Sequence, residues 1–159
     1  ELLVNGRSVG RKKLKNKCRA VFNTVYEDGE LTAVAYDAAG EEIGRQIMKT
    51  AGEETVLRIT PESSSVKPKG LVFIPMQYTD SDGVWKPMEK HTLKVSVKNG
   101  RLVGLGHAGP YVEGNYTDDT TKTYFGEAMA VAQADGDGPV QVTVTDEAGE
   151  NCVEIPCRA

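Results

Sequence analysis

Short stretches of alternating apolar and polar residues, each ended by a Gly, Asp, Asn or Pro turn, recur along the whole chain. In one of them, Val140, Val142 and Val144 alternate with Gln141, Thr143 and Thr145. A period of two places the apolar side chains on one face of a half-buried strand. No long window carries the 3.6-residue period of a helix. The pattern therefore predicts an all-β fold of short antiparallel strands.

The first part of the chain, residues 1–50, reads as a small β module. Asn5-Gly6 separates residues 2–4 from residues 7–11, and this dipeptide favours a type I′ hairpin because both residues tolerate positive φ. Further strands are expected at residues 20–25, 31–36 and 43–48. The small, polar and glycine-containing residues 50–54 mark the boundary of this module.

Residues 51–159 predict a larger second module. About seven short strands separated by turns suit an immunoglobulin-like β-sandwich. Pro75 lies inside one of these strands and, lacking an amide donor, predicts a sheet edge or a bulge there. Gly100, Gly104 and Gly106 fit bulges and close backbone packing better than a phosphate loop. The expected strands are residues 55–60, 72–79, 91–97, 101–106, 124–134, 140–145 and 151–156, with a long polar loop over residues 107–122.

Charge and hydropathy exclude two classes of partner. The 159 residues carry a formal net charge of −4, so no basic field is available to bind nucleic acid. The basic run at residues 11–17 is short and fits a solvated loop or an edge strand. No apolar run approaches the roughly 20 residues of a membrane-spanning helix. We therefore expect neither nucleic acid nor membrane as a partner.

Cysteine and aspartate spacing gives no support for a cofactor. Cys18, Cys152 and Cys157 match no zinc pattern, which predicts free and mostly buried thiols. Residues 80–83 and 135–138 resemble pieces of calcium loops but lack the twelfth-position glutamate and the helices of an EF-hand. Hairpin turns use the same residues, so turns are the favoured interpretation and calcium the lesser one. We expect no cofactor and no metal.

Side-chain chemistry bears on two further candidate functions, glycoside hydrolysis and carbohydrate binding. A glycosidase needs two facing carboxylates, but Glu113, Asp118 and Asp119 share one loop, so no catalytic residue is predicted. Carbohydrate binding is the alternative, because Trp85, Tyr111 and Tyr116 are aromatic residues in loop-like places. For Trp85 and Tyr111, closing the core and contacting sugar are evenly balanced interpretations. For Tyr124, closing the end of the core is favoured.

Several motifs also resemble one enzyme family. The sequence ELLVNGRSVG at residues 1–10 resembles the hairpin after the catalytic barrel in family 2 glycoside hydrolases of the β-galactosidase type. Residues 26–37 and the Thr-Ala-Gly junction at residues 50–52 resemble the same module. GRLVGLG at residues 100–106 and TYFGEAMAV at residues 123–131 resemble the C-terminal module, although Glu127 stands where an arginine is usual.

The resemblance implies a non-catalytic C-terminal region of a larger glycosidase whose catalytic glutamates lie on a (β/α)₈ barrel. It implies that the first module is truncated, because a strand or two normally precede the hairpin. The partners would be the barrel or another subunit, with carbohydrate as a further possibility, in a periplasmic or secreted bacterial enzyme. A carbohydrate-binding module and a freestanding adhesin-like module are the alternatives. We also expect the first module to expose an edge or an apolar face that a partner covers.

Overall fold

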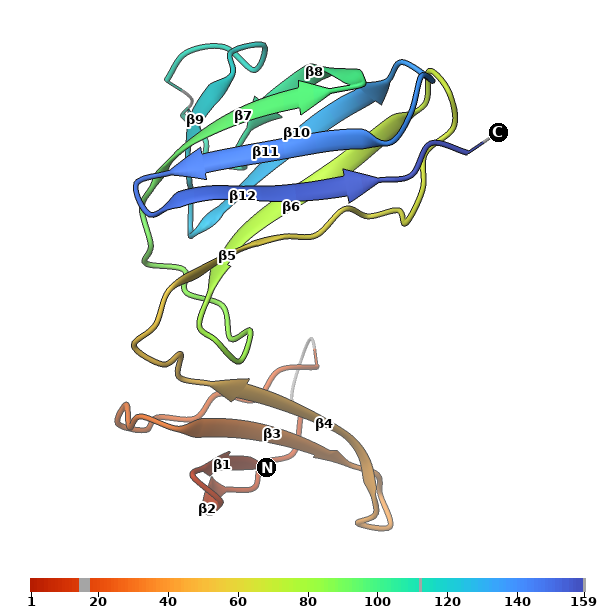
Figure 1. The fold of residues 1–159 in the computed structure, drawn as a ribbon. Helices are drawn as coiled ribbons and strands as arrows, with labels where there is room; N and C mark the ends of the chain where they lie inside the picture. The colour runs from red at the N-terminus through yellow and green to blue at the C-terminus, as the bar shows by residue number, and fades with distance from the viewer. Residues whose placement is uncertain (15–17, 112, 159) are drawn as a thin grey trace. The chain divides into compact units, whose positions relative to one another are not determined.

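The computed structural model describes residues 1–14, 18–111 and 113–158. The chain divides into two compact units, Glu1–Ala51 and Gly52–Ala159, which we call the first and the second unit and describe separately (Figure 1). Their regular elements are all β-strands in antiparallel sheets, so the predicted all-β fold is confirmed. Among the described residues, no helix is long and apolar enough to cross a membrane.

The first unit is one antiparallel sheet with the strand order β2-β1-β3-β4. Asn5 and Gly6 join β1 to β2 with φ values of 49° and 76°. Both lie in the left-handed region, as the predicted type I′ hairpin requires. The strands are β1 (Leu2–Val4), β2 (Arg7–Gly10), β3 (Glu30–Tyr36) and β4 (Glu42–Lys49).

The strand predicted for residues 20–25 does not form, and this prediction is wrong. The segment pairs with no strand among the described residues, and the side chain of Val25 is 78% exposed. A period of two makes a segment suitable for a sheet, but only a neighbouring strand can satisfy its backbone donors and acceptors. In the basic run, residues 11–14 are outside any strand, and residues 15–17 lie outside the described residues.

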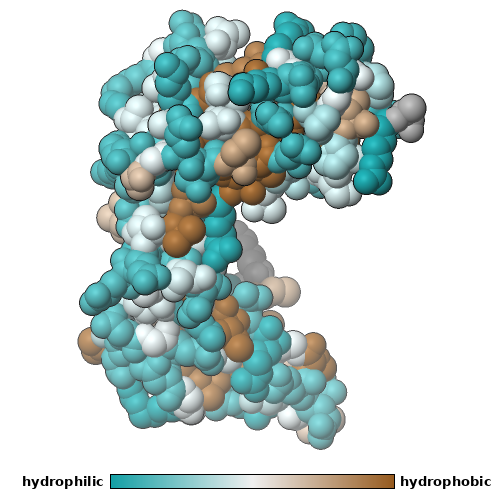
Figure 2. Space-filling model, in the orientation of Figure 1, coloured by the Kyte–Doolittle hydropathy of each residue, from teal (hydrophilic) through white to brown (hydrophobic). Residues whose placement is uncertain are grey.

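The first unit has very little core. Among its described residues, Val4 and Val34 are the buried hydrophobic side chains, with Thr32 buried beside them. Figure 2 shows hydrophobic side chains as brown patches on the surface of this unit. Such a small buried area contributes little against the conformational entropy of the chain. The exposed large hydrophobic side chains are Leu14, Val21, Val25, Tyr26, Leu31, Ile43, Ile47 and Met48.

The second unit is a sandwich of two four-stranded antiparallel sheets, ordered β5-β6-β10-β8 and β12-β11-β7-β9 (Figure 1). It has one strand more than predicted, because β9 lies within the expected long loop. The strands are β5 (Val56–Ile59), β6 (Leu71–Thr79), β7 (Thr92–Lys98), β8 (Gly100–Gly106), β9 (Thr120–Lys122), β10 (Glu127–Ala134), β11 (Val140–Asp146) and β12 (Gly149–Ile155).

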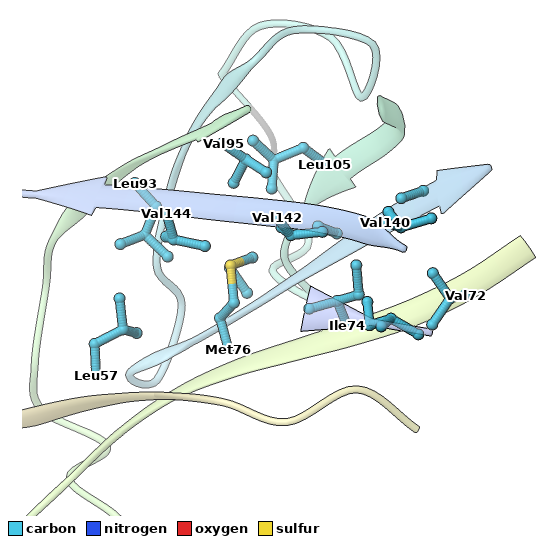
Figure 3. Packing of buried hydrophobic residues seen from close by; sticks show 14 of the residues in the cluster. Leu57, Val72, Ile74, Met76, Leu93, Val95, Leu105, Val140, Val142 and Val144 are labelled. Atoms are coloured by element: carbon cyan, nitrogen blue, oxygen red, sulfur yellow. The ribbon is translucent and has the colours of Figure 1, made fainter. Parts of the chain in front are cut away.

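The core of the second unit lies between these two sheets (Figure 3). Val140, Val142 and Val144 on β11 are fully buried, as their alternation predicted. They meet Ile74 and Met76 from β6 in the same cluster. Each such side chain contributes about 1.5–3 kcal/mol to folding, so this cluster dominates the stability of the unit.

Pro75 does not mark a sheet edge, and that prediction is wrong: β6 lies between β5 and β10, in continuous register with β10. The Pro75 carbonyl accepts a hydrogen bond from the Thr60 N–H at 3.0 Å, on the side of β5. The nitrogen of a strand residue points to the same side as its carbonyl. β5 ends at Ile59, so the side of Pro75 that lacks an N–H donor faces Thr60, just beyond the paired residues of β5.

The three cysteines are free, as predicted, but none of them is fully buried, so the prediction of mostly buried thiols is wrong. Cys152 lies on the edge strand β12, where Ile155 is buried and Val153 is half-buried. Alternation along this strand therefore turns Cys152 outward. Cys18 is also exposed, and Cys157 is half-buried.

Candidate functional site

The outer face of the β5-β6-β10-β8 sheet carries large apolar side chains. A strand that served only the core would place its large side chains inward. In β10 the larger Met129 and Val131 instead alternate with the core positions and point outward. This arrangement leaves larger apolar side chains on the outer face of β10 than on its core face. The core positions of β10 are all alanines: Ala128, Ala130, Ala132 and Ala134.

The sheet register groups the outward side chains into rows. Gln77 on β6 pairs with Glu127 on β10, and the amide Nε2 of Gln77 donates to Glu127 Oε1 at 2.6 Å. The next outward row joins Pro75 to Met129, and Phe73 follows on β6. A polar row therefore borders an apolar floor.

The side of this floor along β8 is formed by a returning loop. The N–H of Leu105 donates to the carbonyl of Tyr116 at 2.7 Å, which holds the loop against the strand. A Cβ at Gly106 would lie 2.4 Å from ring atoms of Tyr116, so only glycine lets the ring approach. The β8–β10 register also shifts at Val131. The close packing and the bulge predicted from the β8 glycines are thus confirmed.

Aromatic rings gather at the end of the floor near the polar row. Tyr124 stacks on His107 at a centroid distance of 5.7 Å and meets Phe125 edge to face at 4.6 Å. The indole Nε1 of Trp85 donates to the carbonyl of Phe125 at 2.9 Å. Phe125 is 55% exposed and Trp85 is 44% exposed, so both rings keep a solvent-facing surface.

Phe125 holds an unfavourable backbone conformation. Tyr124 and Glu127 bridge across a two-residue turn in which Phe125 has a φ of 51° and Gly126 a φ of 71°. For a residue with a bulky side chain, the left-handed region costs about 1–2 kcal/mol. Because the ring is more than half exposed, burial does not offset this cost. The turn thus holds an aromatic ring at the surface.

Together these features form an open groove with a volume of about 1150 Å³. Trp85, Tyr116, Tyr124 and Phe125 contribute aromatic rings to its lining. Arg58 extends the polar row, because it pairs with Gln77 across β5 and β6. An apolar lining with a few convergent polar groups is typical of ligand sites.

The structure brings together two of the three aromatic residues predicted to contact carbohydrate. Trp85 and Tyr116 both line the groove. Tyr111 is 88% exposed and lies outside that lining. Tyr124 also lines the groove and is absent from the core cluster, so the expectation that it closes the core is wrong.

Sequence reasoning missed Phe125, Met129 and the Gln77–Glu127 pair. The alanines at every second position of residues 128–134 were an available signal, since they fill the core positions and leave larger residues for the other face. Phe125 carried no such signal, because its place depends on a turn anchored by Trp85.

The loop carboxylates do not form a facing pair. Glu113 lies 2.6 Å from Lys122 Nζ, and this hydrogen bond lowers the pKa of Glu113. A general acid in glycoside hydrolysis needs a raised pKa. Asp118 instead accepts the N–H of Asn115 at 2.8 Å. The loop therefore holds its acids in ion pairs and turns.

Asp80 serves as a turn residue. Its Oδ2 accepts the N–H of Gly52 at 2.8 Å, and its Oδ1 accepts the N–H of Val84 at 2.7 Å. These backbone bonds, that of Gly52 foremost, lower the pKa of Asp80. The geometry supports the turn interpretation over calcium, and no group of three potential metal ligands occurs among the described residues.

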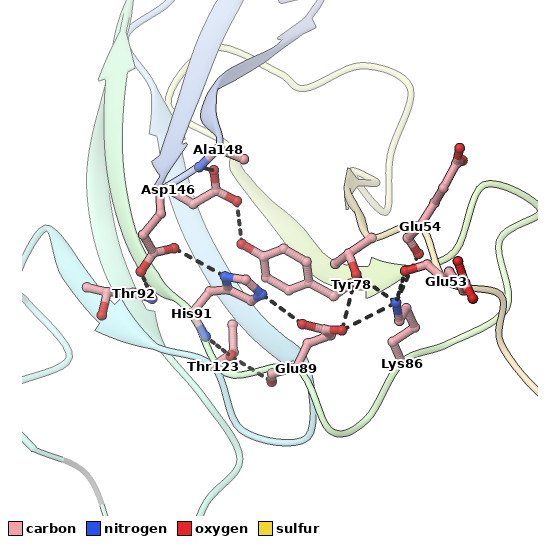
Figure 4. Close-up of polar contacts among 12 residues, drawn as sticks. Glu53, Glu54, Tyr78, Lys86, Glu89, His91, Thr92, Thr123, Asp146 and Ala148 are labelled. Atoms are coloured by element: carbon pink, nitrogen blue, oxygen red, sulfur yellow. Dashed lines mark hydrogen bonds and ion pairs between the residues drawn. The ribbon is translucent and has the colours of Figure 1, made fainter.

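A second polar cluster surrounds His91 at one end of the sandwich (Figure 4). Its Nε2 lies 3.0 Å from Glu89 Oε2, and its Nδ1 lies 3.1 Å from Glu147 Oε2. The ring stacks on Tyr78 at 4.0 Å, and the Tyr78 hydroxyl donates to Asp146. Both nitrogens of His91 are occupied, so the cluster ties strands together and offers no open base.

The stability of the second unit should depend on pH through His91. Burial opposes the charged ring, but hydrogen bonds to Glu89 and Glu147 outweigh it and raise the pKa of His91 above 6.5. The stabilisation is fully present below pH 6.5 and is lost as pH rises through the higher folded-state pKa. The loss is at most about 1 kcal/mol, because solvent screens the partly exposed pair.

Urea unfolding at several pH values between about pH 6 and about pH 8 measures this effect. The unfolding free energy of the unaltered chain should fall over this range, and that of His91→Gln should stay nearly level. If the unfolding free energy fell equally with pH in both proteins, His91 would be excluded as the titrating group.

Models of known protein families match parts of both units. The model for glycoside hydrolase family 2 C-terminal domain 5 matches residues 57–152. A domain of unknown function, DUF4982, matches residues 1–44. No curated protein gives a significant match.

Solved structures share the fold. A family 2 glycosyl hydrolase from Bacteroides cellulosilyticus superposes with a TM-score of 0.92 at 23% identity, over 99% of this chain and 21% of that one. A β-glycosidase from Bacteroides vulgatus gives 0.84 at 20% identity, over 98% and 20%. A family 2 β-glucuronidase gives 0.78 at 15% identity, over 99% and 17%. The chain spans about a fifth of their length. Because the domain 5 model covers more than half of the sequence, this chain belongs to the glycoside hydrolase family 2 C-terminal domain 5 family.

Proposed function

We propose that this chain is a non-catalytic accessory region of a family 2 β-glycosidase and that its first unit packs against the catalytic part of the same enzyme. The observation that carries the proposal is the small core of the first unit, in which Val4 and Val34 are the buried hydrophobic side chains among the described residues. A sheet with so little buried area needs a second layer to be stable.

Exposed apolar side chains on both faces of β3 and β4 support the need for that layer. Leu31 pairs with Met48 and shares its face of the sheet, and both are exposed. Ile47, on the other face of β4, is exposed as well. Large exposed apolar areas mark protein contact surfaces. The related structures are about five times longer than this chain, so such enzymes contain ample further protein to supply the contact.

We further propose that the parent enzyme cleaves a β-linked sugar. The β-galactosidase-type motifs and the β-glucuronidase among the related structures both support cleavage of a β-linked sugar. The Bacteroides sources of two related structures support a bacterial enzyme. We place it in the periplasm or outside the cell, where polysaccharides are met.

Amide hydrogen exchange tests the packing of the first unit. The 159-residue chain alone should exchange quickly in β3 and β4, and the same strands should be protected in the full-length enzyme. Strands β6 and β11 of the second unit serve as the internal control, because their core is complete in both samples.

Equal exchange of β3 and β4 in the two samples would overturn the proposal. Protection that appears only as the isolated chain dimerises, measured by sedimentation, would assign the surface to a second copy instead.

A further inference from the structure

We propose that the groove on the second unit binds an uncharged oligosaccharide, with sugar rings resting on Phe125 and Trp85 and hydroxyl groups meeting the Arg58–Gln77–Glu127 row. The proposal goes beyond the packing role, since it concerns a different unit and a different class of partner. It rests on the shape, the chemistry and the charge of the groove.

The aromatic rings supply the apolar contact. Phe125 and Trp85 are each about half exposed, and Tyr116 lines the groove along β8. The face of an aromatic ring is electron-rich and attracts the weakly positive C–H groups on one face of a pyranose. The strained turn at Phe125 holds this ring in place before any ligand arrives, which lowers the entropy cost of binding.

The polar row offers both hydrogen-bond donors and hydrogen-bond acceptors. Gln77 donates to one oxygen of Glu127, which leaves the other carboxylate oxygen and the Gln77 carbonyl as acceptors. Arg58 uses Nε and Nη2 for Thr79 and Ser81, and its remaining amino group provides donors. A sugar hydroxyl donates and accepts at once, so adjacent donors and acceptors suit it.

The charges in the lining favour an uncharged ligand. Arg58 is balanced by the acidic residues Glu62 and Glu127. An anionic polysaccharide would meet these carboxylates without a cluster of cations to offset the repulsion. A protein partner is disfavoured by the groove form and by the polar row beside the floor, because the centre of a protein interface is typically depleted of charge.

Affinity electrophoresis of the 159-residue chain tests the proposal. Native gels would contain galactomannan, xyloglucan or arabinoxylan as uncharged probes and polygalacturonate as the anionic probe. We expect at least one uncharged polysaccharide to retard the chain and polygalacturonate to leave it unaffected.

Phe125→Gly is the decisive variant, since glycine accepts the positive φ and the change removes the aromatic side chain without adding backbone strain. We expect it to remain folded by circular dichroism and to bind about tenfold more weakly. Phe125→Tyr should keep the affinity. The matched control is Tyr111→Ala, which removes an exposed aromatic ring outside the groove lining and should change nothing.

Retardation by none of the uncharged probes, or unchanged binding by Phe125→Gly, would overturn the proposal. So would a full-length enzyme that binds none of the uncharged polysaccharides although the 159-residue chain binds one, since protein would then fill the groove. These readouts concern the second unit only, so the proposed packing of the first unit can fail or hold independently.

Discussion

Gly126→Ala is expected to destabilise the second unit by about 2–4 kcal/mol. Gly126 has a φ of 71°, a conformation that costs alanine about 1 kcal/mol or more. The new Cβ would also lie 2.4 Å from the backbone oxygen of Lys86. Because that oxygen belongs to backbone, it cannot rotate away as a side-chain tip could.

Relief of this clash would disturb several bonds at once. The Gly126 carbonyl accepts the N–H of Tyr78 at 2.8 Å, and the Lys86 N–H donates to the Tyr78 carbonyl at 2.9 Å. Moving the Lys86 segment also pulls on the bond from Trp85 to Phe125. The turn, the strand end and the aromatic end of the groove should therefore loosen together.

Urea unfolding followed by the fluorescence of Trp85, the single tryptophan, measures the loss. Gly104→Ala is the matched control, because its Cβ would meet Tyr116 O at an ordinary 3.7 Å. It should change the unfolding free energy by less than about 1 kcal/mol. Similar losses in both variants would show that backbone strain at Gly126 is unimportant.

Ile74→Ala is expected to cost the second unit about 2–5 kcal/mol, the range for large-to-small changes in a packed core. Ile74 on β6 has 0% exposure and lies in the cluster between the two sheets. Truncation removes buried methyl groups and leaves a cavity that the flanking sheets can close only in part.

Leu71→Ala is the control within the same strand. Leu71 is 52% exposed on the outer face, so its loss should cost less than about 1 kcal/mol. The same unfolding measurement serves both variants. Equal costs at the two positions would contradict the assignment of the core to the space between the sheets.

Most strands could be predicted from the sequence. The predictions that were wrong concern segments whose structure depends on which strand lies beside them. Residues 31–36 and 140–145 formed strands because alternation matches the pleat. Residues 20–25 have a similar composition and stay unpaired, since a strand also needs a neighbour. Pro75 sits in an inner strand because β5 happens to end beside it.

The candidate site was predictable only in part. Trp85 and Tyr116 stand out in the sequence as aromatic residues near turns, and the fold brings both to one groove. Tyr111 has the same local character and stays apart. Phe125 was missed because its exposure depends on a turn whose carbonyl is held by a residue 40 positions away.

The sequence alone determined the all-β character of this protein, its hairpin turns and the absence of long helical or membrane-spanning patterns, because these depend on neighbours a few residues apart. The tertiary structure decided which face of each strand meets a second layer. Alternation defines two faces but cannot say which one will be covered, since that depends on contacts between distant strands. In β10 the alanine face is covered, and the larger side chains are left to line the groove.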